Sequence, residues 1–289
     1  MTKVIVTGGA GFIGTHLVKA LQALGHEIVV VDIKIDPNDD VRDPAVLQKL
    51  FKGAEYVFHL AALVSVPYSI EHPLETNATN LTGTLNVLIA ARDAGVKRVI
   101  FSSSAAVYGD QDVLPVKETA ELRPMSPYAL EKFESEMYLK LFSEIYGLET
   151  VSLRYFNIYG EGQDPNGPYA SAIPKFLKAK KEGKPLTIVG DGSQTRDFVH
   201  VSDVVSANIA AMMSTNGGKG EAINIATGRK VSMRQVAELI LSREANEGSI
   251  EHLPARFEIK DSVADISKAK ELLDWEPKVA FEEGIQRLL

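Results

Sequence analysis

The chain has 289 residues, 45% of them hydrophobic and 24% charged, a composition typical of a globular protein with a large core. Its 31 basic and 38 acidic residues give a net charge of −7, which argues against binding to nucleic-acid phosphates. There is no cysteine, the six histidines are scattered, and no apolar run approaches the roughly 20 residues of a membrane helix. We therefore expect a cytoplasmic protein without a disulfide framework, metal site or membrane span.

Short apolar strands alternate with helical segments through the first half of the chain. Apolar segments bounded by polar residues or glycine predict strands at residues 3–6, 27–31, 56–60, 98–102 and 150–153. Segments with helical periodicity lie between them, at residues 12–24, 44–50, 77–94 and 128–146. Alternation of this kind is typical of βαβ units, and nearly continuous apolar strands indicate helices on both faces of the sheet. The sequence therefore predicts an α/β fold with a doubly wound parallel sheet.

The second half of the chain differs from the first in its glycine and proline content and in the length of its predicted elements. Glycine and proline crowd residues 160–168, and shorter helical and extended pieces follow to the end. We expect a first, Rossmann-type domain over residues 1–157 and a smaller C-terminal lobe over residues 158–289. Segments around residues 190–230 are expected to return to the first domain, and the strand at 222–225 and the helix at 232–241 are candidates for that return.

Three glycines follow the first predicted strand and open a helix. Gly8 permits a tight turn, Gly11 lets the backbone approach a pyrophosphate, and Gly14 lets the helix pack against the sheet. Asp32 ends the second predicted strand, 18 residues beyond Gly14, where a carboxylate accepts hydrogen bonds from an adenosine ribose. This pattern predicts a site for NAD rather than NADP, because Asp32 would repel a 2′-phosphate. The nearby Lys34 leaves NADP open as an alternative.

A serine, a tyrosine and a lysine form the second chemical pattern. Ser104 follows the strand at residues 98–102, at the edge of the sheet where ligand sites collect. Pro127 suits the first turn of a helix, and Tyr128 and Lys132 then lie on one face of it. A nearby ammonium favours the phenolate, as would the positive ring of an oxidised nicotinamide. The pattern predicts that Tyr128 takes a proton from a substrate hydroxyl while hydride leaves the same carbon.

These residues belong to motifs that run along nearly the whole chain. The motifs are TGGAGFIG (7–14), HLAALVSVPYS (59–69), NLTGTLNVL (80–88), SSSAAVYGD (102–110), SPYALEK (126–132), LRYFNIYG (153–160), QDPNGPYASAIPKF (163–176), GDGSQTRDFVHVSDV (190–204) and ADISKAKELLDWEP (264–277). With them, the chain resembles the extended short-chain dehydrogenases/reductases, and within that superfamily the UDP-hexose 4-epimerases. The resemblance implies NAD as cofactor and a UDP-sugar as substrate.

The resemblance also implies roles for individual residues. Tyr128 would be the base, Lys132 would lower its pKa and bind the nicotinamide ribose, and Ser104 would hydrogen-bond the reacting hydroxyl. The residues implied to line the cofactor, besides Tyr128 and Lys132, are Gly8, Gly11, Phe12, Ile13, Gly14, Asp32, Asp40, Val41, Leu60, Ala61, Ala62, Asn80, Ser102 and Tyr155. Those implied to bind the substrate, besides Ser104, are Ser65, Asn157, Ala172, Thr187, Val189, Arg196, Arg256 and Ser262.

The reaction that the resemblance implies is inversion at C4 of UDP-glucose and UDP-galactose. Related dehydratases and decarboxylases usually carry Glu or Asp soon after the active-site hydroxyl residue, where this chain has Ala105 and Ala106. The small Ser262 resembles the residue that borders the sugar site in epimerases that accept N-acetylhexosamines. This adds UDP-N-acetylglucosamine and UDP-N-acetylgalactosamine as a second pair of substrates. Alternatively, Ser262 is an ordinary polar residue of a surface loop. The rival functions are a nucleotide-sugar dehydratase or reductase, and a non-catalytic NAD-binding regulator of the same fold.

The long helix at residues 128–146 carries more apolar surface than one contact needs. Its apolar residues recur at helical spacing, and we expect most of the following in the core: Leu130, Phe133, Met137, Leu141 and Ile145. We also expect this helix and the helix at residues 80–94 to pair with their symmetry mates in a homodimer built on four helices.

Overall fold

A six-stranded parallel sheet forms the centre of the computed structural model, which describes residues 1–166, 171–241, 249–255 and 259–289. The strand order is β10-β5-β4-β3-β1-β2. The strands are β1 (Lys3–Thr7), β2 (Glu27–Val31), β3 (Tyr56–His59), β4 (Arg98–Ser104), β5 (Glu149–Tyr155) and β10 (Lys219–Ile225). All five predicted strands of the first half are present, and the predicted α/β fold is confirmed.

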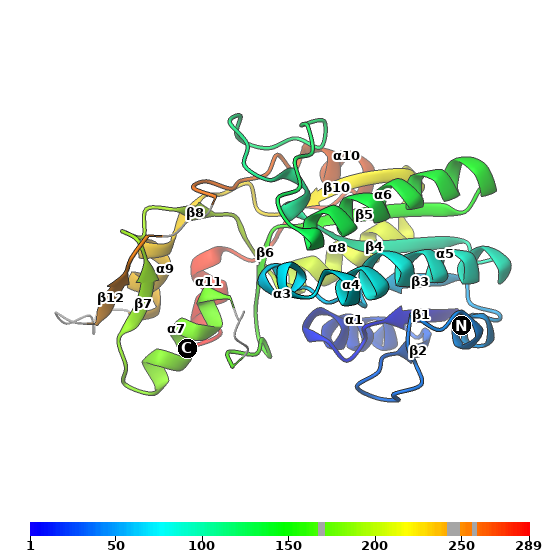
Figure 1. The fold of residues 1–289 in the computed structure, drawn as a ribbon, viewed down its shortest axis with the longest axis horizontal. Helices are drawn as coiled ribbons and strands as arrows, with labels where there is room; N and C mark the ends of the chain where they lie inside the picture. Colours follow the sequence, from blue (N-terminus) through cyan, green and yellow to red (C-terminus); the bar gives the residue numbers. More distant parts are fainter. Residues whose placement is uncertain (167–170, 242–248, 256–258) are drawn as a thin grey trace.

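Helices cover both faces of this sheet because side chains alternate along each strand. In β1, Val4 and Val6 face one hydrophobic cluster and Ile5 faces the other. The first cluster is closed by α1 (Phe12–Ala23), α8 (Val201–Met213) and α10 (Ser267–Leu273). The second is closed by α2 (Pro44–Leu50), α5 (Gly83–Asp93) and α6 (Pro127–Tyr146). Figure 1 shows α5 and α6 side by side along one face of the sheet.

The helix predicted at residues 77–94 begins earlier and is not uniform. After α3 (Val66–Glu71), the chain enters α4 (Pro73–Asn77), passes through a π-helical turn at Ala78–Thr82, and continues as α5. Proline at the first position of α4 explains the earlier start, because its missing N–H and fixed φ suit the first turn of a helix. A short 3₁₀ helix at Ala105–Tyr108 follows β4.

The prediction for the apolar positions of α6 is wrong. Leu130, Met137, Leu141 and Ile145 are exposed, Ile145 by 65%, and only Phe133 is partly buried. The buried stripe of α6 has the same helical spacing but is largely polar: Tyr128, Glu131, Lys132, Ser135, Glu136, Leu139 and Phe142. Buried hydrogen bonds satisfy these polar groups, so the helix turns its polar side to the sheet and its apolar side outward.

A smaller lobe gathers beside the large sheet (Figure 1). Its hydrophobic cluster is built by α7 (Ala172–Lys181), β7 (Leu186–Val189), α9 (Met233–Leu241) and α11 (Phe281–Gln286). Its strands include, besides β7, β6 (Asn157–Tyr159), β8 (Thr195–Arg196), β9 (Phe198–His200), β11 (Val231–Ser232) and β12 (Ile250–Leu253). In the described part of this lobe, three two-stranded sheets pair β11 with β8, β12 with β7 and β6 with β9. The chain returns to the large sheet with α8 and β10, whereas α9 stays in the smaller cluster.

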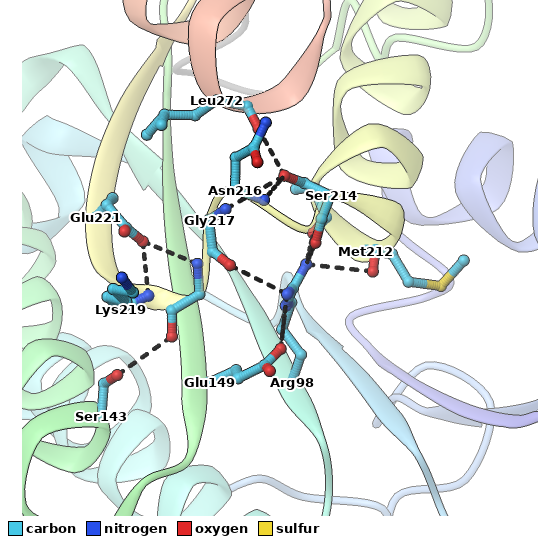
Figure 2. Close-up of polar contacts among 12 residues, drawn as sticks. Arg98, Ser143, Glu149, Met212, Ser214, Asn216, Gly217, Lys219, Glu221 and Leu272 are labelled. Carbon is cyan, nitrogen blue, oxygen red and sulfur yellow. Dashed lines mark hydrogen bonds and ion pairs between the residues drawn. The ribbon is translucent and has the colours of Figure 1, made fainter.

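A polar cluster closes the amino end of the large sheet (Figure 2). Arg98 begins β4 and is buried; its guanidinium donates to the carbonyls of Ala211 at 2.6 Å, Ser214 at 2.7 Å and Gly217 at 3.1 Å. The same group pairs with Glu149 at 2.6 Å. A cation at the end of α8 satisfies carbonyls that the helix leaves without partners, so this cluster fastens α8 to the sheet.

Within the described part of the chain, no helix has both the length and the apolar character needed to cross a membrane.

Candidate active site

The glycine loop joins β1 to α1 and fits a dinucleotide phosphate. Gly8 has a φ of +71°, and a Cβ there would lie 2.6 Å from the Ala61 nitrogen. A Cβ at Gly14 would lie 2.3 Å from the Gly8 carbonyl oxygen. Side chains are therefore excluded at Gly8 and Gly14, and Gly11 caps the helix whose N-terminus an anion would face. The residues present fit the pyrophosphate of NAD.

Asp32 lies where the sequence predicts it, directly after β2. One of its carboxylate oxygens accepts from the Ala10 amide and the other from the Lys34 amide, both at 2.9 Å. The carboxylate thereby ties the glycine loop to the end of β2, and both Asp32 and Lys34 line the large cavity described below.

Ser104, Tyr128 and Lys132 converge at the carboxyl end of β4. Ser126 caps α6 by accepting from the Ala129 amide at 3.2 Å, and Pro127 follows at the first helical position, as predicted. This start places Tyr128 and Lys132 on the buried face of the helix. The Lys132 ammonium donates to the Ser102 carbonyl at 2.7 Å, and it lies 5.9 Å from the centre of the Tyr128 ring.

Burial dominates the electrostatics of this group. It raises the pKa of Tyr128, a hydrogen bond with Ser104 works in the opposite direction, and the negative charge of Glu131 raises the pKa further. Burial lowers the pKa of Lys132 to about 8, although Glu131 and Glu136 both favour its charged form. The expected lowering of the Tyr128 pKa is therefore not produced by the chain's own groups. It requires a further positive charge beside the phenol, which is what an oxidised nicotinamide carries.

One cavity of about 1160 Å³ brings most of the predicted site residues together. It runs from the glycine loop and Asp32, past the end of β4, to α7 and β7 of the smaller lobe. The predicted residues on its wall are Gly8, Gly11, Phe12, Ile13, Gly14, Asp32, Asp40, Val41, Leu60, Ala61, Ala62, Ser102, Ser104, Tyr128, Lys132, Tyr155, Asn157, Ala172, Thr187, Val189 and Arg196. A single cavity thus spans both lobes.

A second cavity of about 260 Å³ adjoins the first, because Ser104, Asn157 and Arg196 line both. Its remaining wall includes Ala105, Ala106 and Ser262. Ser262 is therefore close to the predicted reaction centre, on the wall of a small annex. Its amide donates to the Thr195 carbonyl at 3.2 Å, which holds the segment against β8.

Two predicted residues do not line either cavity, and a third falls outside the described residues. Ser65 caps α3 by accepting from the Tyr68 amide at 3.1 Å. Asn80 is buried behind the wall of the large cavity, where its side chain bonds the backbone of Leu63. Arg256 lies outside the described residues.

Several residues at the site were not predicted. Phe156, Gln163, Phe176 and Met233 line the large cavity without belonging to any charged or hydroxyl pattern. Glu131 and Glu136 are buried on either side of Lys132, and Glu136 pairs with the buried Arg154 at 2.6 Å. Their helical spacing with Tyr128 was the available signal, but a glutamate in a helix is ordinarily a surface residue.

Comparison with known proteins agrees with this geometry. Residues 4–226 match the family described as NAD dependent epimerase/dehydratase. The chain belongs to this family. It is 40% identical, with a TM-score of 0.91, to the UDP-N-acetylglucosamine 4-epimerase of Methanobrevibacter ruminantium, whose structure holds UDP-N-acetylmuramic acid; the match covers 99% of this chain and 96% of that one. NAD is accordingly the cofactor of this protein.

Other members of the family carry out different reactions. The UDP-glucose 4-epimerase of Thermotoga maritima, solved with UDP-glucose, is 38% identical with a TM-score of 0.91, over 99% of this chain and 96% of that one. The UDP-N-acetyl-α-D-glucosaminuronate decarboxylase of Bacillus cytotoxicus is 36% identical over 99% of this chain and 96% of its own length. Family membership therefore gives an enzyme acting on nucleotide sugars, and the individual reaction has to be argued from the site.

Proposed function

We propose that the protein inverts C4 of a UDP-hexose and interconverts UDP-glucose with UDP-galactose. The proposal rests on the residues around Ser104. Tyr128 supplies one acid/base group, and the two residues that follow Ser104 in the chain, Ala105 and Ala106, carry only methyl groups. A dehydratase or decarboxylase needs a further group near the sugar to direct its additional step. Asp261 also lines the second cavity, but its carboxylate accepts from the Thr195 hydroxyl and pairs with Lys230. With Tyr128 as the acid/base group, removal and return of one proton and one hydride is the chemistry that we assign to the site.

The chain's residues divide this chemistry among them. Bound NAD supplies the hydride acceptor for C4 and afterwards the hydride donor. The Tyr128 phenolate accepts the proton of the C4 hydroxyl and returns it to the keto oxygen. Ser104 hydrogen-bonds that oxygen and favours the phenolate, as would the positive ring of the nicotinamide, and Lys132 would hold the nicotinamide ribose. Because the hydride and the proton both return, the sugar and the cofactor show no net oxidation, and the cofactor should stay bound between turnovers.

We assign one end of the large cavity to NAD and the other to the UDP-sugar. The glycine loop and Asp32 hold the adenosine diphosphate of NAD, whose 2′-phosphorylated form Asp32 repels. Asn157 and Arg196 lie between the lobes, where a guanidinium can bind the diphosphate of the UDP-sugar. Ala172, Thr187 and Val189, on α7 and β7, form the uridine end.

The second cavity supports UDP-N-acetylglucosamine and UDP-N-acetylgalactosamine as a further substrate pair. It opens beside Ser104 and is bounded by the short side chain of Ser262, which leaves room for an acetamido group. Ser262→Tyr is expected to abolish turnover of the acetylated pair and to leave UDP-galactose turnover within a few-fold of wild type. If purified wild-type protein turns over neither acetylated sugar, this part of the proposal fails.

The deciding experiment is incubation of the purified protein with UDP-galactose, without added NAD, followed by analysis of the sugars formed. We expect UDP-glucose, no free keto sugar and no net change in reduced cofactor. A stable keto product would indicate a dehydratase, and net reduction of NAD would indicate a dehydrogenase or reductase. Release of carbon dioxide from a UDP-uronic acid would indicate a decarboxylase. Cofactor binding without turnover of any of these sugars would favour the non-catalytic regulator.

We also propose that the protein forms a homodimer through α5 and α6. The apolar residues that α6 exposes, Leu130, Met137, Leu141 and Ile145, form a stripe that a second copy would bury, and the two helices adjoin one another. Light scattering at micromolar concentration should give the mass of two chains, and Met137→Glu should reduce it to that of one. A wild-type mass equal to one chain would exclude this dimer.

A further inference from the structure

Glu131 is a buried carboxylate without a part in the chemistry derived so far. It is 3% exposed, next to Lys132 in the chain and one helical turn from Tyr128. Its two oxygens accept from the Thr76 hydroxyl at 2.8 Å and from the Asn80 side-chain nitrogen at 2.7 Å. A buried charge is expensive to maintain and calls for a reason beyond packing.

The hydrogen bonds of its partner Asn80 can form with the side-chain amide in only one of its two orientations. The Asn80 oxygen accepts from the Leu63 amide at 2.8 Å, and the nitrogen donates to the Leu63 carbonyl at 3.0 Å as well as to Glu131. An ionised carboxylate can only accept, so it requires the nitrogen of the amide to face it. The Leu63 amide and carbonyl select the same orientation, and Glu131 adds a third bond that a flipped amide would lose. The segment held in this way, from Leu60 to Val64, lines the large cavity.

A chain of buried polar groups continues from Asn80 to the glycine loop. The Thr84 hydroxyl donates to the Asn80 carbonyl and contacts His59 at 3.0 Å, and the other ring nitrogen of His59 lies 2.7 Å from the Thr7 hydroxyl. Thr7 immediately precedes Gly8. Burial and the Lys132 charge lower the pKa of His59 to about 3, so this ring stays neutral at ordinary pH.

We propose that Glu131 is a positioning residue for the reaction assigned above: its buried carboxylate holds the Asn80 amide, which fixes the Leu63 backbone, and it places a negative charge next to Lys132 in the helix. The proposal rests on the proposed function. The titratable groups that act on Lys132 are Glu131 and Glu136 of α6, its neighbour Tyr128 on the same face, and His59 of β3. Glu136 is already paired with Arg154 of β5, whereas among the described residues no cation lies within ion-pair distance of Glu131.

The test compares three variants by NMR, without requiring turnover. Glu131→Gln keeps the shape and removes the charge; Glu131→Asp keeps the charge and shortens the reach; Glu144→Gln, on the exposed side of the same helix, is the matched control. The Cε resonance of Lys132 in lysine-labelled protein, identified by its loss in Lys132→Arg, reports the titration of the ammonium. Amide hydrogen exchange at Leu63 reports the hold on the cavity wall.

In Glu131→Gln we expect Lys132 to titrate at lower pH than in the wild type, and Leu63 to exchange roughly tenfold faster. In Glu131→Asp we expect faster exchange at Leu63 with the Lys132 titration kept. Glu144→Gln should match the wild type in both. An unchanged Lys132 titration in Glu131→Gln overturns the proposal. If that variant does not fold, Glu131→Asp decides, since wild-type protection of Leu63 would overturn the proposal and lost protection would support it.

An activity measurement separates positioning from a purely structural role. Removing a negative charge lowers the pKa of both Tyr128 and Lys132, so the whole pH–rate profile of Glu131→Gln should move to lower pH. A purely structural residue would lower the rate without moving the profile. If the wild type turns over no UDP-sugar, the proposed function fails while both NMR results remain interpretable.

Discussion

Strand β4 begins at Arg98 and ends at Ser104, and buried cations lie at both of its ends. At the amino end, the Arg98 guanidinium is surrounded by backbone carbonyls and a carboxylate that it binds directly (Figure 2). At the carboxyl end, the Lys132 ammonium has one backbone acceptor and aromatic rings around it, and its pKa is lowered to about 8. The Arg98 guanidinium has hydrogen-bond acceptors and a carboxylate as partners, and it stabilises the fold. The Lys132 ammonium is held in a less favourable state that suits proton chemistry.

The largest expected effect is on the chemical step. Tyr128→Phe keeps the ring packing and removes the acid/base group, so kcat should fall by about 10³-fold or more, which is about 4 kcal/mol of barrier. The free energy of unfolding should stay within about 1 kcal/mol of wild type. Single-turnover assays and denaturant unfolding would measure the two. Retained turnover would mean that the proton is transferred elsewhere.

At the amino end of β4 we expect a substitution to reduce stability and to leave the rate nearly unchanged. Arg98→Met leaves the carbonyls at the end of α8 without donors, so we expect a loss of about 3 kcal/mol in the free energy of unfolding. The folded variant should keep a near-wild-type kcat. The control is Arg92→Met, which removes an exposed pair with Asp93 and a contact with the Tyr146 ring, and it should change stability far less than Arg98→Met. If Arg98→Met and Arg92→Met reduced the free energy of unfolding equally, Arg98 would have no special role in stability, and the contrast with Lys132 would be wrong.

The remaining prediction concerns the dependence of stability on pH. Since the pKa of Lys132 falls from 10.5 to about 8 on folding, the unfolded chain binds more protons than the folded chain between these values. The penalty is complete below pH 8 and is relieved as the pH rises toward 10.5. The stability of the wild type relative to Lys132→Met should therefore increase with pH across this window. Denaturant unfolding at a series of pH values would detect it, and a constant difference would show that Lys132 is not destabilised by burial.

The sequence allowed the sheet and the glycine loop with Asp32 to be predicted, because strand periodicity and the spacing of the glycines with Asp32 are local properties. The long helix shows where this reasoning stops. Apolar periodicity selected Leu130, Met137, Leu141 and Ile145 as buried, whereas the buried stripe is the polar one. The polar stripe is buried because Asn80, Thr76 and Arg154 provide hydrogen-bond and ion-pair partners for it. These residues lie in other segments of the chain, so the helix sequence alone does not reveal them.

The site was predicted where a role depends on residue type and missed where it depends on tertiary neighbours. Tyr128 and Lys132 were recognisable from their spacing. Asn80 belongs to a recognisable motif, yet its side chain supports the cavity wall from behind. The apolar residues of the wall, such as Phe156 and Met233, carry no chemical signature at all.

The late position of β10 in the chain has a consequence for biosynthesis. This strand pairs with β5, although the whole excursion through α7 and β7 separates the two along the chain. While the polypeptide emerges from a ribosome, the edge of β5 therefore has no native neighbour until Ile225 has been added. Exposed strand edges recruit other chains, so nascent or truncated forms that stop before β10 are the ones expected to aggregate or to require a chaperone.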